Sequence, residues 1–326
     1  MPIPQHPSRR RFLLGMAGLA GLAGLGGPAA FRALAAARGL ASRTRAGLAF
    51  GTTVALTAAG PDPAALDAGL SGGFAALRAV EAAASLFRAD SALSRLNRDG
   101  WLDAPPADLT TMLGFALDLA DRTDGAFDPT VQPLWPVWAE AAARGDKPDP
   151  NRLRQAVARV GWRRVALGPE RIVLESGTAL TLNALIQGHA ADRVMAALRG
   201  RGITDAFVDT GEFGAMGAHP DGTPWQLGIA DPRRPEAMAA VIAPFSGFAA
   251  TSGDYGTSFS PDRADHHIFD PTTGRSPRGL ASVTVTAGTG LLADGLSTAC
   301  MVLGPEKGGR LVAQWPGCSV RFLGKA

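Results

Sequence analysis

The run Gly290-Leu291-Leu292-Ala293-Asp294-Gly295-Leu296-Ser297-Thr298 combines a carboxylate and a hydroxyl at a spacing that suits a metal ion. Asp294 and Thr298 are four residues apart, so on a helix both side chains lie on one face. Carboxylate and hydroxyl oxygens are hard ligands of the kind that Mg²⁺ prefers. A second interpretation stays open: Asp294 caps a helix, and Thr298 is an ordinary residue of the inner turn.

A second chemistry-bearing motif is His266-His267-Ile268-Phe269-Asp270-Pro271-Thr272-Thr273-Gly274. Its Asp-Pro-Thr-Thr-Gly end is typical of a turn, because proline restricts φ and glycine permits positive φ. Neighbouring side chains of a strand point to opposite faces, so the two imidazoles are not expected to bind one metal. One of them could act as a general base near neutral pH, or both could be solvated histidines of an edge strand.

Three glycine-containing segments accompany these motifs. Residues 188–192 are expected to open a helix, residues 125–131 to form a turn between helices, and Gly211-Glu212-Phe213-Gly214 to follow a strand. A Gly-x-x-Gly turn lets a ligand approach the backbone closely. The chain lacks the G-x-G-x-x-G dinucleotide fingerprint, a Walker A loop, a G-x-S-x-G elbow and an H-E-x-x-H motif, so those function classes are unsupported.

The periodicity predicts an α+β fold in which mostly antiparallel sheets pack with helices. The length of 326 residues suggests roughly two lobes. The expected helices cover residues 62–87, 108–122 with Asp108 as N-cap, 133–144, 152–160, 188–199, 291–303 and 305–314. The expected strands cover residues 45–56 with a break at Gly51, 164–167, 172–175, 179–182, 206–210, 215–217, 224–229, 238–243, 248–251, 283–286 and 319–322.

The composition is that of a folded protein. Hydrophobic residues make up 46% and charged residues 19% of the chain, and the mean hydropathy is +0.07, which excludes general disorder. Cys300 and Cys318 are the two cysteines, too few for a disulfide scaffold or for a cysteine-built zinc or iron–sulfur site. They could form one disulfide or none.

The net charge of +3 does not indicate a nucleic-acid-binding protein. Arg9, Arg10, Arg11 and Arg32 lie near the N-terminus, and no acidic residue precedes Asp62. Without those four arginines the net charge changes from +3 to −1. Aromatic residues are only 6%, and no later Lys/Arg run has the length used to bind phosphates.

The N-terminus has the pattern of an export signal. Ser8-Arg9-Arg10-Arg11-Phe12-Leu13 is a twin-arginine pattern, followed by a weakly apolar run and a small-residue cleavage site that ends at Ala35. We expect residues 1–35 to be a Tat signal peptide, residues 36–326 to be the mature domain, and the protein to reach the periplasm. An uncleaved N-terminal anchor helix is the alternative, which the glycines of the run disfavour.

Taken in order, these motifs resemble the FAD:protein FMN transferase (ApbE) family. The resemblance spans nearly all of the mature chain. Its segments are residues 50–52, 85–97, 125–134, 182–192, 208–217, 250–255, 267–274 and 293–298. The combination of Thr-Ser-Gly-Asp-Tyr, His-Ile-Phe-Asp-Pro-Thr-Thr-Gly and Ala-Asp-Gly-Leu-Ser-Thr is highly specific to that family.

The resemblance implies an Mg²⁺-dependent enzyme that moves FMN from FAD to a Thr or Ser hydroxyl of an acceptor protein and releases AMP. Metal ligands are implied at Asp294, Thr298 and the backbone carbonyl of Ala184. Flavin-side contacts are implied at Phe50, Phe87, Ala126, Phe127, Asp128, Thr181, Gln187, His267 and Ile268. His267 is the candidate base for the acceptor hydroxyl, and a membrane-bound respiratory flavoprotein subunit is the expected acceptor.

The chain departs from the family pattern at four positions. Thr181 stands where the family usually has Asp, Gln187 where it has Lys or Glu, His189 where it has Tyr, and Glu212 where it has the second Gly of a pair. The first two changes remove charges near the nucleotide. The alternative is therefore a flavin carrier or an FAD pyrophosphatase of the same fold with weak or no transferase activity. A third, unrelated hypothesis is a non-enzymatic periplasmic binding protein, against which the intact Asp294 and Thr298 pair counts.

Overall fold

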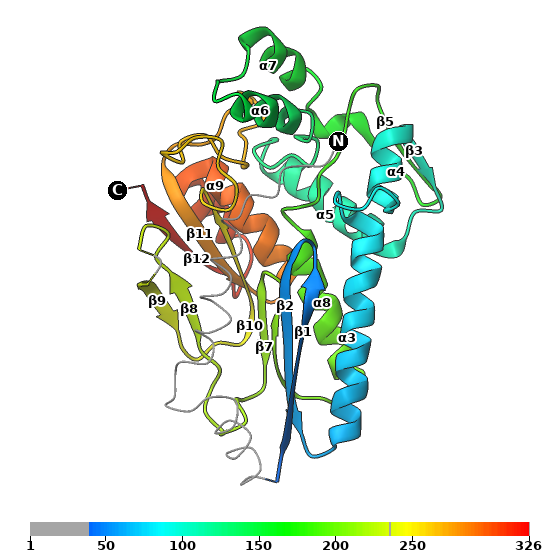
Figure 1. The fold of residues 1–326 in the computed structure, drawn as a ribbon, viewed down its shortest axis with the longest axis vertical. Coiled ribbons are helices and arrows are strands. Elements are labelled where there is room, and N and C mark those ends of the chain that lie inside the picture. Colours follow the sequence, from blue (N-terminus) through cyan, green and yellow to red (C-terminus); the bar gives the residue numbers. More distant parts are fainter. Residues whose placement is uncertain (1–38, 235, 326) are drawn as a thin grey trace. The chain divides into compact units, whose positions relative to one another are not determined.

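The structure is a computed structural model that describes residues 39–234 and 236–325 (Figure 1). The expected Tat signal at residues 1–35 lies outside the described residues. The chain divides into two compact units. Unit 1 comprises the described residues up to Leu77 together with Ala191–Phe248, and unit 2 comprises Arg78–Ala190 with the residues from Ala249 onward. Within the described ranges, no helix has both the length and the apolar character needed to cross a bilayer.

Unit 1 is built on four neighbouring strands in the order β1-β2-β6-β7. Each neighbouring pair is antiparallel. Its strands are β1 (Ala41–Ala49), β2 (Thr52–Gly60), β6 (Asp205–Asp209) and β7 (Phe213–Met216), with a separate antiparallel pair β8 (Leu227–Ala230) and β9 (Met238–Ile242). Helix α3 (Pro63–Ala84) packs on this sheet: its Phe74 contacts Gly47, and its Gly73 lies against Leu56. The mixed class with antiparallel pairing, expected from sequence, is confirmed.

The strand expected over residues 45–56 with a break at Gly51 is in fact two antiparallel strands, because the chain reverses at that break. Phe50 and Gly51 have φ values of 54° and 73°, two successive positive values that form a tight hairpin turn between β1 and β2. The sequence contained this turn as Phe-Gly, whereas the pairs that usually signal it are Asn-Gly and Asp-Gly.

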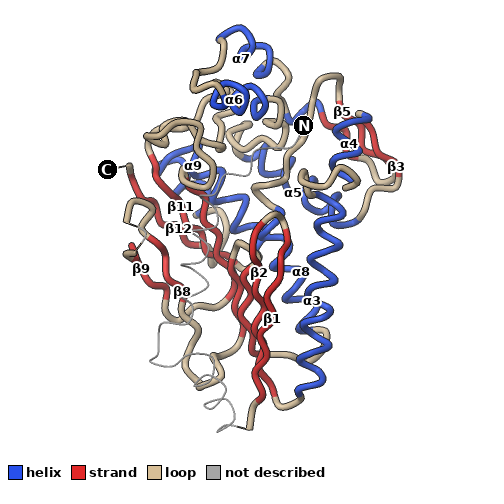
Figure 2. The backbone as a smooth tube through the Cα atoms, in the orientation of Figure 1, coloured by secondary structure: helices blue, strands red, loops and turns tan. Residues whose placement is uncertain are grey.

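Unit 2 combines helices with two groups of strands (Figure 2). Its helices are α4 (Ala92–Asp99), α5 (Ala107–Arg122), α6 (Leu134–Ala143), α7 (Pro150–Val157), the short 3₁₀ helix η1 (Trp162–Arg164), the first turn of α8 (Ile186–Arg199) and α9 (Gly290–Val312). Its strands run β10 (Gly247–Gly253), β11 (Leu280–Ala287), β12 (Ser319–Gly324) in one sheet and β3 (Trp101–Asp103), β5 (Arg171–Leu174), β4 (Val165–Leu167) in another.

Helix α9 covers β11, whose side chains are almost all buried, and it also contacts β12 (Figures 1 and 2). Gly295 lets α9 approach its other neighbours, since a Cβ there would lie 2.7 Å from Phe115 of α5 and 2.9 Å from Leu185. The two helices expected at residues 291–303 and 305–314 are confirmed as the two parts of α9, which non-helical backbone separates. The kink falls at Gly304, whose φ is 75°, immediately before Pro305.

The expected strand at residues 179–182 is wrong, and the reason is a side chain from a helix that the sequence analysis missed. The Asn97 amide of α4 donates to the Leu180 carbonyl at 2.8 Å and accepts the Leu180 N–H at 2.7 Å. Both backbone groups of Leu180 are thus satisfied without a partner strand. The signal for α4 was present: Ser91 caps it by accepting from the Ser94 N–H, and Gly100 ends it with φ 78°.

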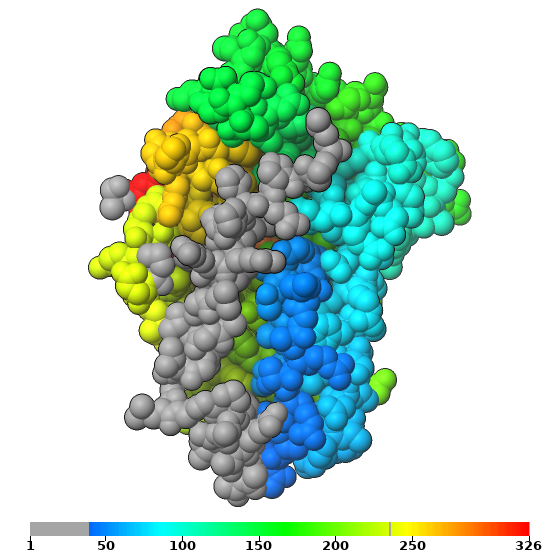
Figure 3. Space-filling view, viewed as in Figure 1, coloured from blue at the N-terminus to red at the C-terminus, as the bar shows by residue number. Residues whose placement is uncertain are grey.

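The segment that carries both histidines packs against α6 and α7 through a hydrophobic cluster, to which it contributes Phe269. Leu134, Trp138, Leu153, Ala156 and Phe269 form the buried core of this cluster. The Trp138 indole donates to the Gly274 carbonyl at 2.8 Å. Figure 3 shows the surfaces of the α6–α7 segment and of the loop after β10 in contact. Cys300 and Cys318 are both free, so there is no disulfide between them.

We predict that Trp138→Ala lowers the free energy of unfolding by about 3–5 kcal/mol, because it removes a buried indole and leaves a cavity. Trp138→Phe keeps an aromatic ring but loses the hydrogen bond to Gly274. The loss of this bond should lower the free energy of unfolding by about 1 kcal/mol, in addition to the effect of the smaller ring. Urea unfolding of both variants, with the half-exposed Trp101→Ala as a control, measures this. Equal losses for Trp138→Ala and Trp101→Ala would contradict it.

Candidate functional site

Asp294 lies buried in the first half of α9 and faces the first turn of α8. Its Oδ2 accepts the Gly188 N–H at 2.9 Å. The first N–H groups of a helix have no partner within that helix, so Asp294 caps α8 from a neighbouring helix. The N-cap of α9 itself is Thr289, which accepts from the Leu292 N–H at 3.3 Å. The interpretation of Asp294 as a cap of its own helix is therefore wrong.

The approach of α8 to α9 depends on two facing glycines. A Cβ on Gly188 would overlap the Gly290 carbonyl and lie 2.7 Å from the Asp294 Cβ, and a Cβ on Gly290 would overlap the Gly188 carbonyl. Both positions therefore require glycine for backbone-to-backbone contact, rather than for an unusual φ. This contact places the Asp294 carboxylate against the first turn of α8.

Thr298 lies one turn further along α9, in a chain of hydroxyls that the sequence analysis missed. Ser297 Oγ donates to the Asp294 carbonyl at 2.8 Å. Ser252 Oγ, on β10, is 2.7 Å from Ser297 Oγ and 2.8 Å from Thr298 Oγ1. Since Ser297 has used its proton, Ser252 donates to Ser297 and Thr298 donates to Ser252. Thr298 Oγ1 consequently keeps its lone pairs as an acceptor or a metal ligand.

Ala184 lies in a tight turn directly before α8. The N–H groups of Leu185 and Ile186 both donate to the Leu182 carbonyl at 2.9 Å, and Gly188, four residues after Ala184, donates to Asp294. The expected donor set thus consists of the Asp294 carboxylate, the Thr298 hydroxyl and the Ala184 backbone carbonyl, all hard oxygens that suit Mg²⁺. Across the described residues, no group of three or more His, Cys, Asp or Glu side chains offers an alternative metal site.

His267 is half-buried and oriented by its own loop. Its backbone N–H donates to the Thr257 carbonyl at 3.0 Å, and its ring Nδ1 is 3.1 Å from the same oxygen. A carbonyl can only accept, so Nδ1 carries a proton and Nε2 is the nitrogen that can accept one. Gly256 lies against the ring: a Cβ at this position would be 3.2 Å from His267 Cε1. These contacts fix the tautomer and the orientation of the ring.

His266 has a structural role. It is fully buried: Nε2 donates to the Pro277 carbonyl at 3.2 Å, and Nδ1 accepts the Ile268 N–H at 3.4 Å. Its backbone exchanges two bonds with Ser276 Oγ. Burial lowers the pKa of His266 to about 4, so the ring is neutral at pH 7. The alternative of two solvated edge histidines is wrong, because no regular strand forms here and His266 is enclosed.

With the geometry in place, sequence comparison identifies the family. Residues 50–322 match the ApbE family. The chain belongs to the ApbE family. Among its curated relatives, the FAD:protein FMN transferase of Treponema pallidum (strain Nichols) is 32% identical over 303 residues, covering 86% of this chain and 84% of the relative. The FAD:protein FMN transferase of Haemophilus influenzae is 33% identical over 248 residues, and the match covers 72% of this chain and 72% of the relative.

Solved structures agree with this assignment. The flavin transferase ApbE from Vibrio cholerae superposes with a TM-score of 0.76 at 27% identity, covering 88% of this chain and 94% of the other. The apo form of the Pseudomonas stutzeri flavinyl transferase ApbE gives a TM-score of 0.75 at 30% identity, covering 88% and 92%. Both the class of fold and its assignment to ApbE follow.

Among the flavin contacts that the ApbE resemblance implies, Asp128 and Thr181 belong to connected loops. Asp128 is buried and accepts from the Thr130 N–H at 2.8 Å, the Thr130 hydroxyl at 2.6 Å and the Trp162 N–H at 3.0 Å. Burial raises its pKa, although these bonds oppose the shift. The Thr181 N–H donates to the Pro129 carbonyl at 2.8 Å. The turn that contains Ala184 is thereby joined to the loop at residues 125–131.

The remaining implied contacts differ in exposure. Phe127 and Ile268 are buried, and Ala126 and Gln187 are half-buried. Phe87 is 54% exposed and offers the most open apolar surface of the set in unit 2. Phe50 is buried at the β1–β2 turn and belongs to unit 1.

Two departures from the ApbE pattern are built into local structure. His189 Nε2 is 2.8 Å from Asp108 Oδ1, and both side chains are largely buried. The sequence predicted Asp108 as the N-cap of α5, and this is wrong: Pro106 occupies that position, and Asp108 lies in the first turn. The Glu212 carbonyl accepts from the N–H and the hydroxyl of Thr210 at 2.9 and 3.1 Å.

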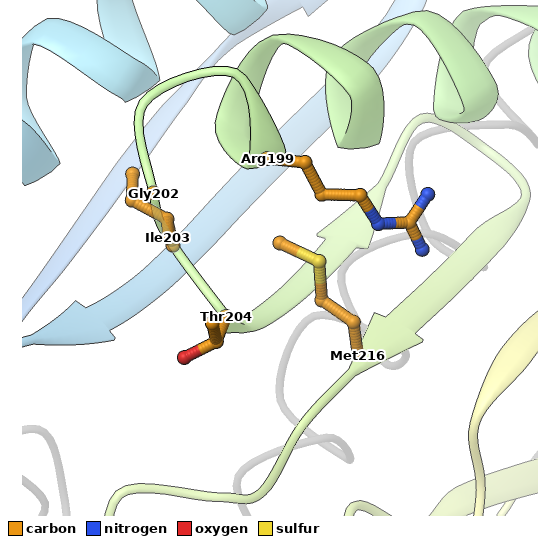
Figure 4. A pocket seen from close by; sticks show the side chains of 5 residues that line it. All are labelled: Arg199, Gly202, Ile203, Thr204 and Met216. Carbon is orange, nitrogen blue, oxygen red and sulfur yellow. The ribbon is translucent and has the colours of Figure 1, made fainter.

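A surface hollow in unit 1 contains none of the expected site residues (Figure 4). It lies between the end of α8 and β7, and its lining residues are Arg199, Gly202, Ile203, Thr204 and Met216. The chemistry expected of the chain is therefore not located there.

We predict that Gly188→Ala destabilises the protein by about 1–3 kcal/mol and weakens Mg²⁺ binding, because the new methyl group forces α8 away from Gly290. Gly309→Ala, in an open position of α9, is the matched control and should be neutral or stabilising by up to about 1 kcal/mol. Chemical unfolding and calorimetric Mg²⁺ titration measure both effects. Unchanged Mg²⁺ affinity in Gly188→Ala would argue against the proximity of the two helices at the metal ligands.

We also predict a pH dependence of stability from His266. Its pKa is about 4 in the folded protein and near 6.5 when exposed, so the unfolded chain binds more protons between these values. The contribution of His266 is present above pH 6.5 and is lost as the pH falls toward 4. Burial raises the pKa of Asp209 to about 6, which acts in the opposite direction.

The quantity to measure is therefore the difference between the wild type and His266→Gln, whose amide can still bond to Pro277 and Ile268 but does not titrate. Unfolding free energies from pH 7.5 to 4.5 should fall more steeply for the wild type. Parallel curves would show that His266 is not a buried neutral imidazole.

Proposed function

We propose that this chain transfers FMN from FAD to a Thr or Ser hydroxyl of an acceptor protein and releases AMP, in a reaction that requires Mg²⁺. The observation that carries the proposal is the Asp294 carboxylate, buried between α9 and the first turn of α8 with the Thr298 hydroxyl one turn away. Membership of the ApbE family and the names of its curated relatives support the reaction class.

Asp294, Thr298 and the Ala184 carbonyl would hold the metal. When bound, Mg²⁺ neutralises pyrophosphate charge and orients the displacement. Asp294 supplies the negative charge that retains the cation, and the Gly188 N–H keeps that carboxylate from rotating. The Ser252 hydroxyl fixes the rotamer of Thr298 by accepting its proton. This chain's residues thus provide a preorganised oxygen site.

His267 would serve as the base. The acceptor hydroxyl oxygen forms a bond to the phosphorus of the FMN half of FAD, and the bond from that phosphorus to the bridging pyrophosphate oxygen breaks. AMP leaves with the bridging oxygen, and the hydroxyl proton passes to His267 Nε2. The Nδ1–H bond to Thr257 keeps Nε2 as the accepting nitrogen throughout this step.

A second candidate is a flavin carrier or an FAD pyrophosphatase with weak transferase activity. The neutral Thr181 favours it, because the family usually has Asp at this position and Thr181 is engaged in its loop through Pro129 and Asn183. In a pyrophosphatase, water would replace the acceptor hydroxyl, and both FMN and AMP would be released.

We further propose that the protein is exported by the Tat pathway and acts in the periplasm, on the basis of Arg9, Arg10 and Arg11 and the apolar run that follows them. Its acceptor would then be a flavoprotein with a periplasmic face, and a membrane-bound respiratory subunit fits that requirement.

The function is tested by incubating the purified chain with FAD, MgCl₂ and a candidate acceptor protein. Flavin fluorescence that stays with the acceptor on a denaturing gel, together with one equivalent of AMP, supports the transferase. AMP and free FMN without labelled acceptor support the pyrophosphatase, and bound FAD without AMP supports the carrier. An acceptor whose target Thr is replaced by Val is the matched control.

We predict that Asp294→Asn lowers the rate of transfer about a hundredfold or more, since it removes the only full negative charge assigned to the metal. The amide oxygen can still accept from Gly188, so the fold should persist. Asp294→Ala should have the same effect on rate and an additional cost of about 1 kcal/mol in stability. The exposed Asp118→Asn is the control. Normal Mg²⁺-dependent turnover of Asp294→Asn would overturn the metal assignment.

We predict that His267→Ala slows transfer by about a hundredfold, the usual scale for a general base. The affinity for FAD should change much less, because the metal ligands remain in place. Initial rates and FAD affinity are measured separately, with His266→Gln as the control. A loss confined to FAD binding would show that His267 orients the flavin and does not accept the proton.

A further inference from the structure

A buried ionic cluster lies in the connection between β10 and β11, the segment that also carries His267. Asp254 is fully buried, and its Oδ2 is 3.3 Å from Lys325 Nζ. Asp265 is nearly fully buried and pairs with Arg278 at 2.9 Å. Each carboxylate thus has a cation beside it, as a buried charge requires.

Lys325 contacts this connection at three separate points. Besides the ion pair with Asp254, its Nζ donates to the Arg263 carbonyl at 3.0 Å, and its backbone N–H donates to the Gly279 carbonyl at 3.3 Å. Arg263 has a φ of 56°, in the left-handed region that side chains seldom adopt. A bound carbonyl at this residue stabilises a turn that is otherwise strained.

These contacts lie on both sides of the pair that orients His267. Thr257 follows Asp254 by three residues, and His267 follows Arg263 by four. Between these points the two sides of the loop bond to each other: the Phe259 N–H donates to the Asp265 carbonyl at 2.7 Å. One ammonium group therefore connects the segment that leads to Thr257 with the segment that leads to His267.

We propose that Lys325 is a positioning residue for His267: by pairing with Asp254 and binding the Arg263 carbonyl, it holds the Thr257 carbonyl and the His267 ring in register. This inference rests on the proposed role of His267 as the base. Lys325 is far along the chain from the family motifs and lies beyond the matched residues 50–322. It acts on the base only through the loop.

The consequence is a specific kinetic pattern. Lys325→Met keeps the aliphatic side chain but removes the ammonium, so the ring of His267 loses its fixed position while the metal ligands on α9 keep theirs. Small displacements of a catalytic group cost rate more than binding. We expect kcat to fall about tenfold and KM for FAD to change less than about twofold. Lys325→Arg should recover most of the loss.

The decisive experiment is a double-mutant cycle with His267→Ala, using the exposed Lys307→Met as the control for loss of a lysine charge. Transfer rates are measured for Lys325→Met in the wild-type and the His267→Ala backgrounds. We expect a tenfold loss in the first and less than about a twofold loss in the second, since a base that is absent cannot be misplaced. Equal losses in both backgrounds, or normal kcat in Lys325→Met, would overturn the proposal.

Two outcomes separate this inference from the proposed function. If His267→Ala has a normal rate, the base assignment fails and the positioning role fails with it. If His267→Ala is slow but Lys325→Met is normal, only the positioning role fails. If Lys325→Met does not fold, the double variant Asp254→Asn/Lys325→Met removes both charges of the pair. The cycle with His267→Ala is then run with this double variant in place of Lys325→Met. Its kcat should remain low, because the Arg263 carbonyl has still lost its donor.

Discussion

The hydrogen bond from the Gly188 N–H to the Asp294 carboxylate is the interaction on which the site depends. It joins the first turn of α8 to α9 and orients the one carboxylate of the expected metal ligands. A helix N-terminus favours a negative charge, and the same negative charge favours a cation. One oxygen of Asp294 accepts the Gly188 N–H, so the orientation of the whole carboxylate is fixed by α8. The proposed metal site consequently depends on helix packing through one side chain.

Small residues and hydroxyls around Asp294 make that arrangement possible. Gly290 lets the helix backbones touch, and Ser297 and Ser252 form a chain of bonds that ends at Thr298. Since each hydroxyl has a single proton, the direction of donation along this chain is determined from its first member. The hydroxyl of Thr298 therefore donates to Ser252 and keeps its lone pairs as acceptors.

Regular elements were predictable where local periodicity or capping signals were strong. The long helix α3, the hairpin-connected β6 and β7, and α8 lie close to their expected positions. The sequence prediction failed where a distant group replaced a local one. Asn97 satisfies the backbone of Leu180, so no strand forms there. At Phe50–Gly51 the break expected in one strand is a full reversal of the chain between β1 and β2.

The sequence by itself determined the family, the class of fold and the Asp294–Thr298 spacing, since these depend on residue types and their order. Only the tertiary structure decided what neighbouring residues do. His266 and His267 are adjacent and chemically identical, yet one is enclosed and neutral while the other is half-buried and held through Nδ1 by the Thr257 carbonyl. Burial and hydrogen-bond partners from distant segments set the protonation of an imidazole, and no local pattern encodes them.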